Sequence, residues 1–400
     1  MKEPVKILNF GSLNIDKIYN LDHIVNEGET VATISYKESL GGKGLNQTIA
    51  LKRAGVDVYH AGFVGEVDGE ILLDYLRDNK IRSLVKKTSG NSGHAIIQVD
   101  KNANNSIIDD AFAISFLHNS KVFDVKMVSS VAGNVGLEHT TRNLRGLVKA
   151  MDWDVPVYKG LSKPLIGEQI LAEKFHGVNG LLGYEFKDDQ LAPLEKESAI
   201  EAMIKVLEEN EKTLIITVGP LTNIASLLTI REDLKEKISE INIMGGAIGM
   251  GNVTATSEFN IFADPEAADI VFSSGVKINM LGLNVTTQTS YDINMHKEFK
   301  KSELRINQIL ADIMNRRIKR AGAEENYTTH MHDTLSVMYA TNPEIFESKM
   351  LHIDIETNGK YTRGMTIADT RLNSLCEKNI NVVTSIDKDK FKKIFMENLL

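Results

Sequence analysis

Short apolar runs alternate along most of the chain with stretches in which apolar and polar residues recur at helical spacing. The stretch 199–211 places Ile200, Met203, Ile204 and Leu207 on one helical face and acidic residues on the opposite face, as a surface helix does. This alternation is typical of βα units around a mainly parallel sheet, so the sequence predicts an α/β fold. The runs expected to form strands are 5–10, 125–128, 214–218, 241–244 and 278–281.

The pattern changes near residues 102–106. Before this stretch the expected strands are short and partly antiparallel, with apolar positions at 30–34 and 95–99 among their markers. Beyond it the regular βα rhythm begins. We therefore expect two units, a shorter one over residues 1–108 and a longer one over residues 109–400.

Composition and charge exclude several classes of function. The 400 residues are 42% hydrophobic and 25% charged, which is typical of folded cores rather than of disorder. A formal net charge of -8 leaves no broad basic surface for nucleic acid. The single cysteine, Cys376, has no partner for an internal disulfide. Because we find neither a secretion signal nor a membrane-spanning apolar run, we expect a cytoplasmic protein that acts on a small molecule.

Two glycine-rich motifs stand in the first unit, Gly11-Ser12-Leu13-Asn14-Ile15-Asp16 after an expected strand and Gly41-Gly42-Lys43-Gly44-Leu45-Asn46-Gln47 before an expected helix. Each alone is equally well interpreted as a tight turn. Together with 63–65 and 93–100, they resemble the amino-terminal third of ribokinase and its sugar-kinase relatives. That resemblance implies a truncated ribokinase-like segment. Its expected sugar contacts are Asn14, Asp16, Gly42, Lys43 and Asn46.

The resemblance to sugar kinases stops near Ile108. Phosphoryl transfer needs a residue that orients the attacking hydroxyl and an electropositive cradle for the phosphates. Sugar kinases supply both from a later Gly-Ala-Gly-Asp-type motif, which this sequence does not contain. We therefore expect the first unit not to bind ATP productively, and a working sugar kinase is the least favoured of the functions considered.

In the second unit, polar residues follow the expected strands or begin expected helices. Ligands of open α/β sheets bind beyond the carboxyl ends of the strands, so these residues are expected to converge. Separated carboxylates that meet a backbone carbonyl suit a hard cation such as Ca²⁺. A pair of aspartates at a helix start is also a common cap, and Asp264-Pro265-Glu266 is assigned to that structural role. The polar groups are Asp109-Asp110, Asn134, 219–223, 258–260 and His332-Asp333.

The order and spacing of these motifs resemble the inosine–uridine-type nucleoside hydrolases over nearly all of residues 109–400. Members of that family cleave the N-glycosidic bond of ribonucleosides with a Ca²⁺-bound water. By resemblance, Asp110, Asp333 and the backbone carbonyl of Val218 bind Ca²⁺. His332 lies on the base side as a possible proton donor, and His176 lines the base pocket. Ribose contacts are expected from Asp109, Asn134, Asn252, Glu258 and Asn260, with Met244 packed near the ring.

One departure from the family is clear. The family opens with Asp-x-Asp-Pro-Gly-x-Asp-Asp directly after its first strand, and the second Asp serves as general base. Only Asp109-Asp110 remains here. Counting back without gaps places Ala103 and Asn105 at the first two acidic positions, and an amide does not accept a proton as a carboxylate does. Loss of a positioned base costs about 10²–10⁴-fold in rate.

An alternative register keeps an acid in place. Residues 96–99 could replace the missing first strand and bring Asp100 to the metal through a longer loop. The sequence thus predicts a Ca²⁺-dependent nucleoside hydrolase of reduced activity, joined to the truncated sugar-kinase-like segment by fusion of neighbouring genes. The second interpretation is a protein that binds ribose or a nucleoside without cleaving it. Apolar surface left by the truncation favours a homo-oligomer. The preferred base does not follow from the sequence.

Overall fold

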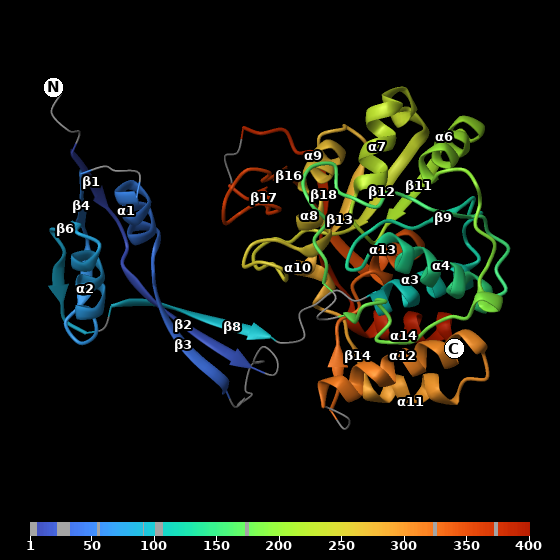
Figure 1. Cartoon of the computed structure of the whole chain (residues 1–400), viewed down its shortest axis with the longest axis horizontal. Coiled ribbons are helices and arrows are strands. Elements are labelled where there is room, and N and C mark those ends of the chain that lie inside the picture. Colours follow the sequence, from blue (N-terminus) through green and yellow to red (C-terminus); the bar gives the residue numbers. More distant parts are fainter. Residues whose placement is uncertain are drawn as a thin grey trace. The chain divides into compact units, whose positions relative to one another are not determined.

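The computed structural model describes residues 6–21, 33–53, 57–90, 92–100, 107–172, 176–322, 326–371 and 375–400. The chain divides into two compact units, Met1–Asn102 and Ala103–Leu400 (Figure 1). Ala103 and Asn105, which the ungapped register places at acidic positions of the family motif, lie outside the described residues.

The described residues of the first unit form three small sheets and two helices. The parallel sheet β1–β4–β6 lies beside helix α1, and the core is formed by Leu13, Leu45, Val64 and Leu72. In the second sheet, β8 runs parallel to β2 along its whole length, from Asn14↔Gly93 to Leu21↔Asp100. The elements are β1 (Lys6–Phe10), β2 (Asn14–Leu21), β3 (Thr33–Gly41), α1 (Lys43–Arg53), β4 (Asp57–Ala61), β5 (Phe63–Gly65), α2 (Glu70–Asp78), β6 (Arg82–Ser83), β7 (Lys86–Thr88) and β8 (Gly93–Asp100).

The glycine motifs of the first unit serve close backbone packing. A Cβ on Gly44 would lie 2.4 Å from the carbonyl carbon of Gly11, and Gly42 has a φ of +100°. Only glycine fits both positions without strain. Asn14 is half-buried, whereas the side chains of Asp16, Lys43 and Asn46 lie outside the described part of the structure.

The second unit is built on a six-stranded sheet of order β11-β12-β13-β18-β16-β17. Its first four strands are parallel, and β16 runs antiparallel to both of its neighbours. This confirms the predicted α/β fold with a mainly parallel sheet. The strands are β11 (Thr213–Thr217), β12 (Ile238–Met244), β13 (Ile278–Leu281), β16 (Phe346–Ile355), β17 (Thr366–Asp369) and β18 (Ile380–Ile386).

The strand expected at 125–128 is shorter than predicted and lies apart from the six-stranded sheet. β9 (Val128–Ser129) pairs only with β10 (Val157–Tyr158), and the ladder is two residues long. β11 forms the near edge of the large sheet and pairs only with β12. In the described part of the chain, the edge of β9 away from β10 and the edge of β11 away from β12 are therefore both unpaired.

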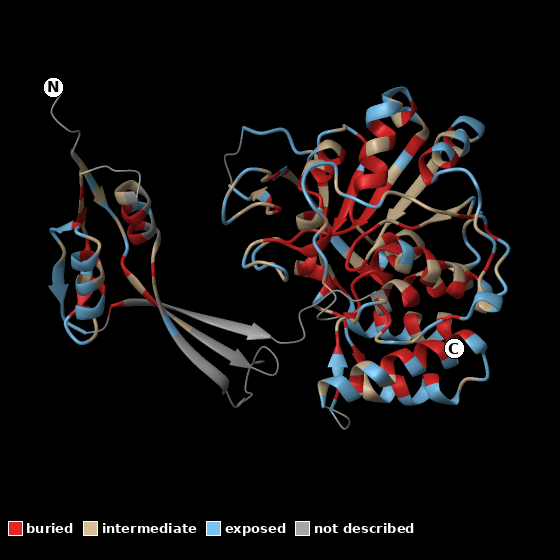
Figure 2. Cartoon of the chain, viewed as in Figure 1, coloured by how far each residue is buried: buried red, intermediate tan, exposed pale blue. Residues whose placement is uncertain are grey.

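Helices cover both faces of the large sheet (Figure 1). One buried cluster joins the sheet to α3, α12, α13 and α14, and a second joins it to α6, α7 and α9. Figure 2 shows the strands buried between these layers. The helices are α3 (Ile107–Ser120), α4 (Leu137–Ala150), α6 (Ala199–Glu209), α7 (Thr222–Ile230), α8 (Phe259–Ala263), α9 (Pro265–Phe272), α10 (Leu283–Thr286), α11 (Ile293–Lys301), α12 (Arg305–Ala321), α13 (Thr334–Thr341) and α14 (Lys388–Leu399), with a small β14 (Tyr291–Asp292) and β15 (Thr328–Thr329) pair.

Local sequence explains where several of these helices begin. Ser198 and Glu201 form a capping box at the start of α6, which matches the helix predicted from residue 199. Asp264 caps α9 with Pro265 in its first turn, so the assignment of this acid to structure is confirmed. Within the described ranges, no helix has the length and apolar character needed to cross a bilayer.

A ladder of two buried asparagines and one half-buried asparagine crosses three parallel strands beneath α13. Asn242, Asn279 and Asn381 are register partners on β12, β13 and β18. The Asn279 amide donates to Asn242 at 2.7 Å, and the Asn381 amide donates to Asn279 at 2.9 Å. At its two ends the ladder reaches α13, because Asn242 donates to the carbonyl of Ser336 and Asn381 to the Tyr339 hydroxyl. The ladder therefore positions α13 against the sheet.

We expect Asn279→Ala to lower the free energy of unfolding by about 2 kcal/mol or more. The variant leaves the Asn242 oxygen and one Asn381 donor buried without their partner, and each such group costs about 1–3 kcal/mol. Urea unfolding followed by circular dichroism measures the change. Asn358→Ala, on an exposed turn, is the matched control. Equal unfolding midpoints for the two variants would show that the ladder does not stabilise the fold.

Candidate active site

Three aspartates converge where α3 and α13 begin. Asp109 and Asp110 lie in the first turn of α3, and Asp333 immediately precedes α13. One carboxylate oxygen of Asp109 accepts hydrogen bonds from the backbone amides of His332 and Asp333, the latter at 3.0 Å. Residues more than 200 positions apart in sequence are thereby held together at two helix N-termini.

The carboxylates of this cluster disfavour one another's charge. Burial raises the pKa of Asp109 to about 7, against the opposing effect of the two backbone amides. Burial and then the charge of Asp109 raise the pKa of Asp110 well above its usual range. Burial followed by the charges of Asp110 and Asp109 does the same to the pKa of Asp333, and the side chains of Asp110 and Asp333 are within hydrogen-bonding reach.

Asn260 joins the ends of two strands to this region. Its amide donates to the carbonyl of Val218 at 3.2 Å and to the carbonyl of Met244 at 3.0 Å. Met244 is fully buried, and its sulfur lies 3.5 Å from the same amide nitrogen. Asp110, Asn134, Val218 and Asn260 line one cavity, so four of the residues selected from the sequence share a common space.

Glu258 is fully buried and caps α8. Its carboxylate accepts hydrogen bonds from the amides of Gly246, Asn260 and Ile261 at 2.9–3.2 Å. Burial raises the pKa of Glu258 to about 7, with the backbone hydrogen bonds opposing the shift. The side-chain oxygen of Asn252 accepts from the amide of Phe259 at 3.0 Å, which fastens the preceding loop to the same helix. Glu258 also contributes to the raised pKa of Asp333, so it lies within electrostatic range of the acidic cluster.

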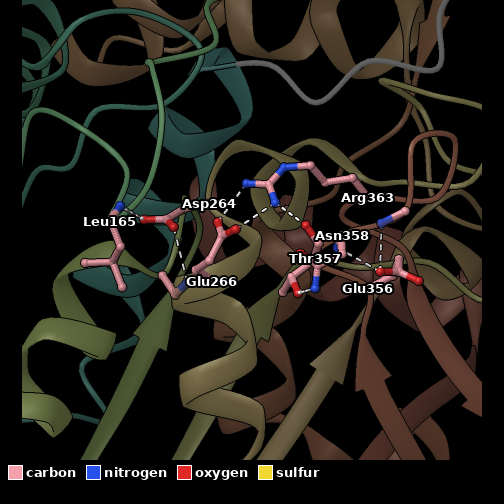
Figure 3. A network of polar contacts seen from close by, with 9 residues as sticks. Leu165, Asp264, Glu266, Glu356, Thr357, Asn358 and Arg363 are labelled. Atoms are coloured by element: carbon pink, nitrogen blue, oxygen red, sulfur yellow. Dashed lines mark hydrogen bonds and ion pairs between the residues drawn. The ribbon is translucent and has the colours of Figure 1, made fainter.

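A polar network holds the far side of this loop (Figure 3). Arg363 makes two hydrogen bonds of 2.7 Å to Glu266 on α9, and its backbone carbonyl accepts from the Ser257 hydroxyl at 2.7 Å. Asp264 also accepts from the Leu165 amide and the Thr222 hydroxyl. The loop that carries Glu258 is therefore fixed by contacts with α9 and with the turn that precedes β17.

The two histidines selected from the sequence are both buried. The Nδ1 atom of His332 lies 2.7 Å from the Thr286 hydroxyl, and its Nε2 atom has no partner among the described residues. Burial, then the charges of His330 and Arg317, lower the pKa of His332 well below its usual range. Burial, then Arg317 and Arg320, lower the pKa of His176 to about 3. Both rings are therefore neutral at pH 7.

Arg317 is a site residue that sequence reasoning missed. Its charge acts on the pKa of Asp109, His332 and His176, which places its guanidinium within electrostatic range of all three. It also donates to the Tyr327 hydroxyl at 2.6 Å. In the sequence, Arg317 is only a basic residue close to the apolar face of α12. Basic residues are common at such positions on helices, so Arg317 carries no specific signal for a site.

The chemistry of these donors fits a hard cation. Asp109 and Asp333 each keep one buried oxygen that has no hydrogen-bond partner in the described part of the chain. Burial raises the pKa of both groups, and the charges of Asp110 and Asp109 raise that of Asp333 further. Oxygen ligands of this kind suit Ca²⁺. The described residues nevertheless contain no group of three or more acidic, histidine or cysteine side chains in metal-binding geometry. The oxygen donors that the structure describes therefore suit Ca²⁺ in kind, but they do not by themselves form a complete metal site.

Comparisons with known proteins identify the family to which the chain belongs. The sequence model of the inosine-uridine preferring nucleoside hydrolases matches residues 96–393, and that of the pfkB family carbohydrate kinases matches residues 5–135. The chain is 37% identical over 295 residues to the pyrimidine-specific ribonucleoside hydrolase RihA of Escherichia coli K12, covering 73% of this chain and 94% of the relative. The RihA of Shigella flexneri is matched to the same extent.

Solved structures show the same relationship. A purine-preferring ribonucleoside hydrolase from Gardnerella vaginalis superposes with a TM-score of 0.67 at 32% identity, covering 73% of this chain and 95% of that one. The plant nucleoside hydrolase PpNRh1 has a TM-score of 0.67 at 25% identity, covering 75% and 96%. Both predicted resemblances are confirmed. From residue 96 to residue 393, the chain belongs to the inosine-uridine preferring nucleoside hydrolase family, preceded by a segment of the pfkB carbohydrate kinase type.

Proposed function

We propose that this protein hydrolyses the N-glycosidic bond of ribonucleosides, giving ribose and the free base, and that it uses Ca²⁺. The observation that carries the proposal is the convergence of Asp109, Asp110 and Asp333 at the starts of two helices, beside a cavity that both Asp110 and Val218 line. This convergence occurs in a chain that belongs to a family of nucleoside hydrolases.

The cation would be held by Asp110, Asp333 and the backbone carbonyl of Val218. When bound, Ca²⁺ would neutralise the mutual repulsion of these acids, orient the ribose hydroxyls and lower the pKa of a water molecule. The ribose contacts would come from the buried side chains of Asp109, Asn134, Glu258 and Asn260 and from the half-buried Asn252, with Met244 as a packing neighbour.

Breaking the glycosidic bond builds positive charge on the ribose ring and negative charge on the departing base. Fixed, buried carboxylates stabilise the ribose cation more strongly than water does, because they need no reorganisation during the reaction. Asp109 is held by two backbone amides and Glu258 by three, so both are rigidly placed for this role. His332 would lie on the base side and donate a hydrogen bond to the leaving group through its neutral ring. His176 would line the base pocket.

The proton acceptor is the part of the machinery that departs from the family. If the ungapped register holds, Asn105 stands at the base position and turnover is reduced about 10²–10⁴-fold. If residues 96–99 instead replace the first strand, Asp100 supplies the carboxylate. The truncated first unit, with its vestigial sugar contacts, is proposed to have no kinase activity because it lacks the phosphate-binding motif of sugar kinases.

A ribose-release assay on the full-length protein tests the proposal. Uridine, cytidine, inosine and adenosine are incubated with protein and Ca²⁺, and the reducing sugar and free base are measured. We expect cleavage of at least one ribonucleoside. Its 2′-deoxy analogue should react about 10²-fold more slowly or worse, because buried groups that bind the missing hydroxyl lose their partner. Binding of ribonucleosides without any release of base would identify a silent binder instead.

A further inference from the structure

A cavity of about 700 Å³ separates the free edges of β9 and β11 within the second unit. Residues 125–131 form one wall and residues 212–218 form the opposite wall. Helices close its two faces, with Ile114 and Leu117 of α3 on one side and Leu207 and Leu227 of α6 and α7 on the other. The cavity is therefore a predominantly apolar slot between β9 and β11, each of which pairs in parallel with its other neighbour.

The order of the strands indicates which element would fill the slot. In the common doubly wound sheet the spatial order is 3-2-1-4-5-6, so the first strand lies between the second and the fourth. Here β10 and β9 correspond to positions 3 and 2, and β11, β12 and β13 correspond to positions 4, 5 and 6. Position 1 falls at the slot. The strand at position 1 precedes the first helix, which in this unit is α3.

The backbone of β9 supports the same conclusion. The amides of Val128 and Ser130 donate to the carbonyls of Pro156 and Tyr158, on the β10 side. Because backbone groups alternate in direction along a strand, the amides of Met127, Ser129 and Val131 point toward the slot. Buried backbone donors are almost always paired in folded proteins. A parallel strand placed in the slot would pair them, and because helices cover both of its faces it would be expected to be mostly apolar.

One segment of the chain has the required sequence and position. Residues 95–99 read Ala-Ile-Ile-Gln-Val, the match to the hydrolase family begins at residue 96, and only residues 101–106 separate Asp100 from α3. Six residues are an ordinary length for a strand-to-helix connection. The ungapped register would instead place residues 98–102 in the slot, including Asp100 and Lys101, and burying two charges there is costly.

We propose that residues 95–100 form the missing strand between β9 and β11, and that this segment is shared in turn by two sheets. In the structure the same residues pair with β2 in the first unit. Pairing with β9 and β11 would carry Asp100 to the carboxyl end of the hydrolase sheet, where Asp110 and Val218 line the same cavity. The large sheet of the second unit and the β2 sheet of the first unit then compete for the same residues.

Hydrogen exchange on the full-length protein, read by mass spectrometry, tests the assignment without reference to activity. We expect the peptides that cover 126–131 and 212–218 to be protected in the wild type. Placing charges on the segment with the double variant Ile97→Asp/Val99→Asp should accelerate their exchange about tenfold or more, since filling the slot would no longer be favourable. Ile97→Val, which keeps an apolar β-branched side chain, is the matched control and should leave the exchange unchanged.

The opposite result is equally specific. Unchanged exchange over 126–131 and 212–218, with acceleration confined to 14–21 and 33–41, would show that the segment belongs to the β2 sheet alone and would overturn the proposal. Should the double variant fail to fold, Ile97→Ala makes the same comparison with a milder change. Because exchange is measured without substrate, failure of this assignment is distinguishable from failure of the proposed hydrolase activity.

Discussion

We expect Asp110→Asn to abolish nucleoside cleavage and yet to raise the thermal stability of the EDTA-treated protein. Removing one carboxylate from a buried cation site costs about 3–5 kcal/mol of interaction with the cation, which corresponds to about 10²–10⁴-fold in rate. Without the cation, the same carboxylate is unfavourable, because burial and the Asp109 charge raise the pKa of Asp110 well above its ordinary value. Ribose release and a thermal melt in EDTA measure the two effects.

The sign of the stability change follows from the direction of that pKa shift. The unfolded chain loses the Asp110 proton at the ordinary value of 3.8, whereas the folded chain loses it only at higher pH, so stability falls as pH rises through this interval. Asparagine does not titrate and avoids that loss. The variant should therefore melt about 2–4 °C higher for each kcal/mol relieved at neutral pH, with little difference near pH 4. Asp154→Asn, at an exposed position, is the matched control. A lower melting temperature for Asp110→Asn in EDTA would contradict the account of the cluster.

The second large effect concerns the proton acceptor. If residues 95–100 complete the hydrolase sheet, Asp100→Asn should lower kcat by about 10²–10⁴-fold, as expected for loss of a positioned base. Asn105→Asp should then change kcat by no more than about threefold, because Asp100 would already occupy the position of the base. Steady-state kinetics with the best ribonucleoside substrate, at saturating Ca²⁺, measure both variants.

The reverse pattern identifies the other register. A large gain in kcat for Asn105→Asp, with Asp100→Asn close to wild type, would place Asn105 at the base position of the family. It would also mean that the slot between β9 and β11 is filled differently from the assignment above. Glu38→Gln, at an exposed position in the first unit, controls for the loss of one carboxylate elsewhere in the chain.

Local patterns were sufficient to predict the fold class and much of the sheet. Apolar runs ending in glycine or a polar turn marked β11, β12 and β13, the apolar periodicity from residue 199 marked α6, and Asp264 marked the start of α9. These features depend on residues a few positions apart, so one sequence carries them. The acidic positions could be chosen because strands of a parallel sheet present their carboxyl ends along one edge.

Features that depend on distant residues were not accessible in the same way. The asparagine ladder across β12, β13 and β18 needs a register that joins positions more than 100 residues apart, and single asparagines carry no such signal. Arg317 acts on Asp109 and His332 only through the packing of α12. The strand predicted at 125–128 proved shorter and lies further along the chain because its extent depends on its partner: β10 pairs with Val128 and Ser129, of which only Val128 lies in the predicted range.

Restoration of activity by Ca²⁺ tests the central claim most directly. Full-length protein is stripped with EDTA, transferred to metal-free buffer and assayed for release of base and ribose from uridine and inosine while Ca²⁺ is added back. The account predicts no release above the Asp110→Asn background before addition and a saturable recovery with Ca²⁺. Hydrolysis that persists undiminished after stripping would contradict it, as would a protein that binds Ca²⁺ yet releases no base from any ribonucleoside.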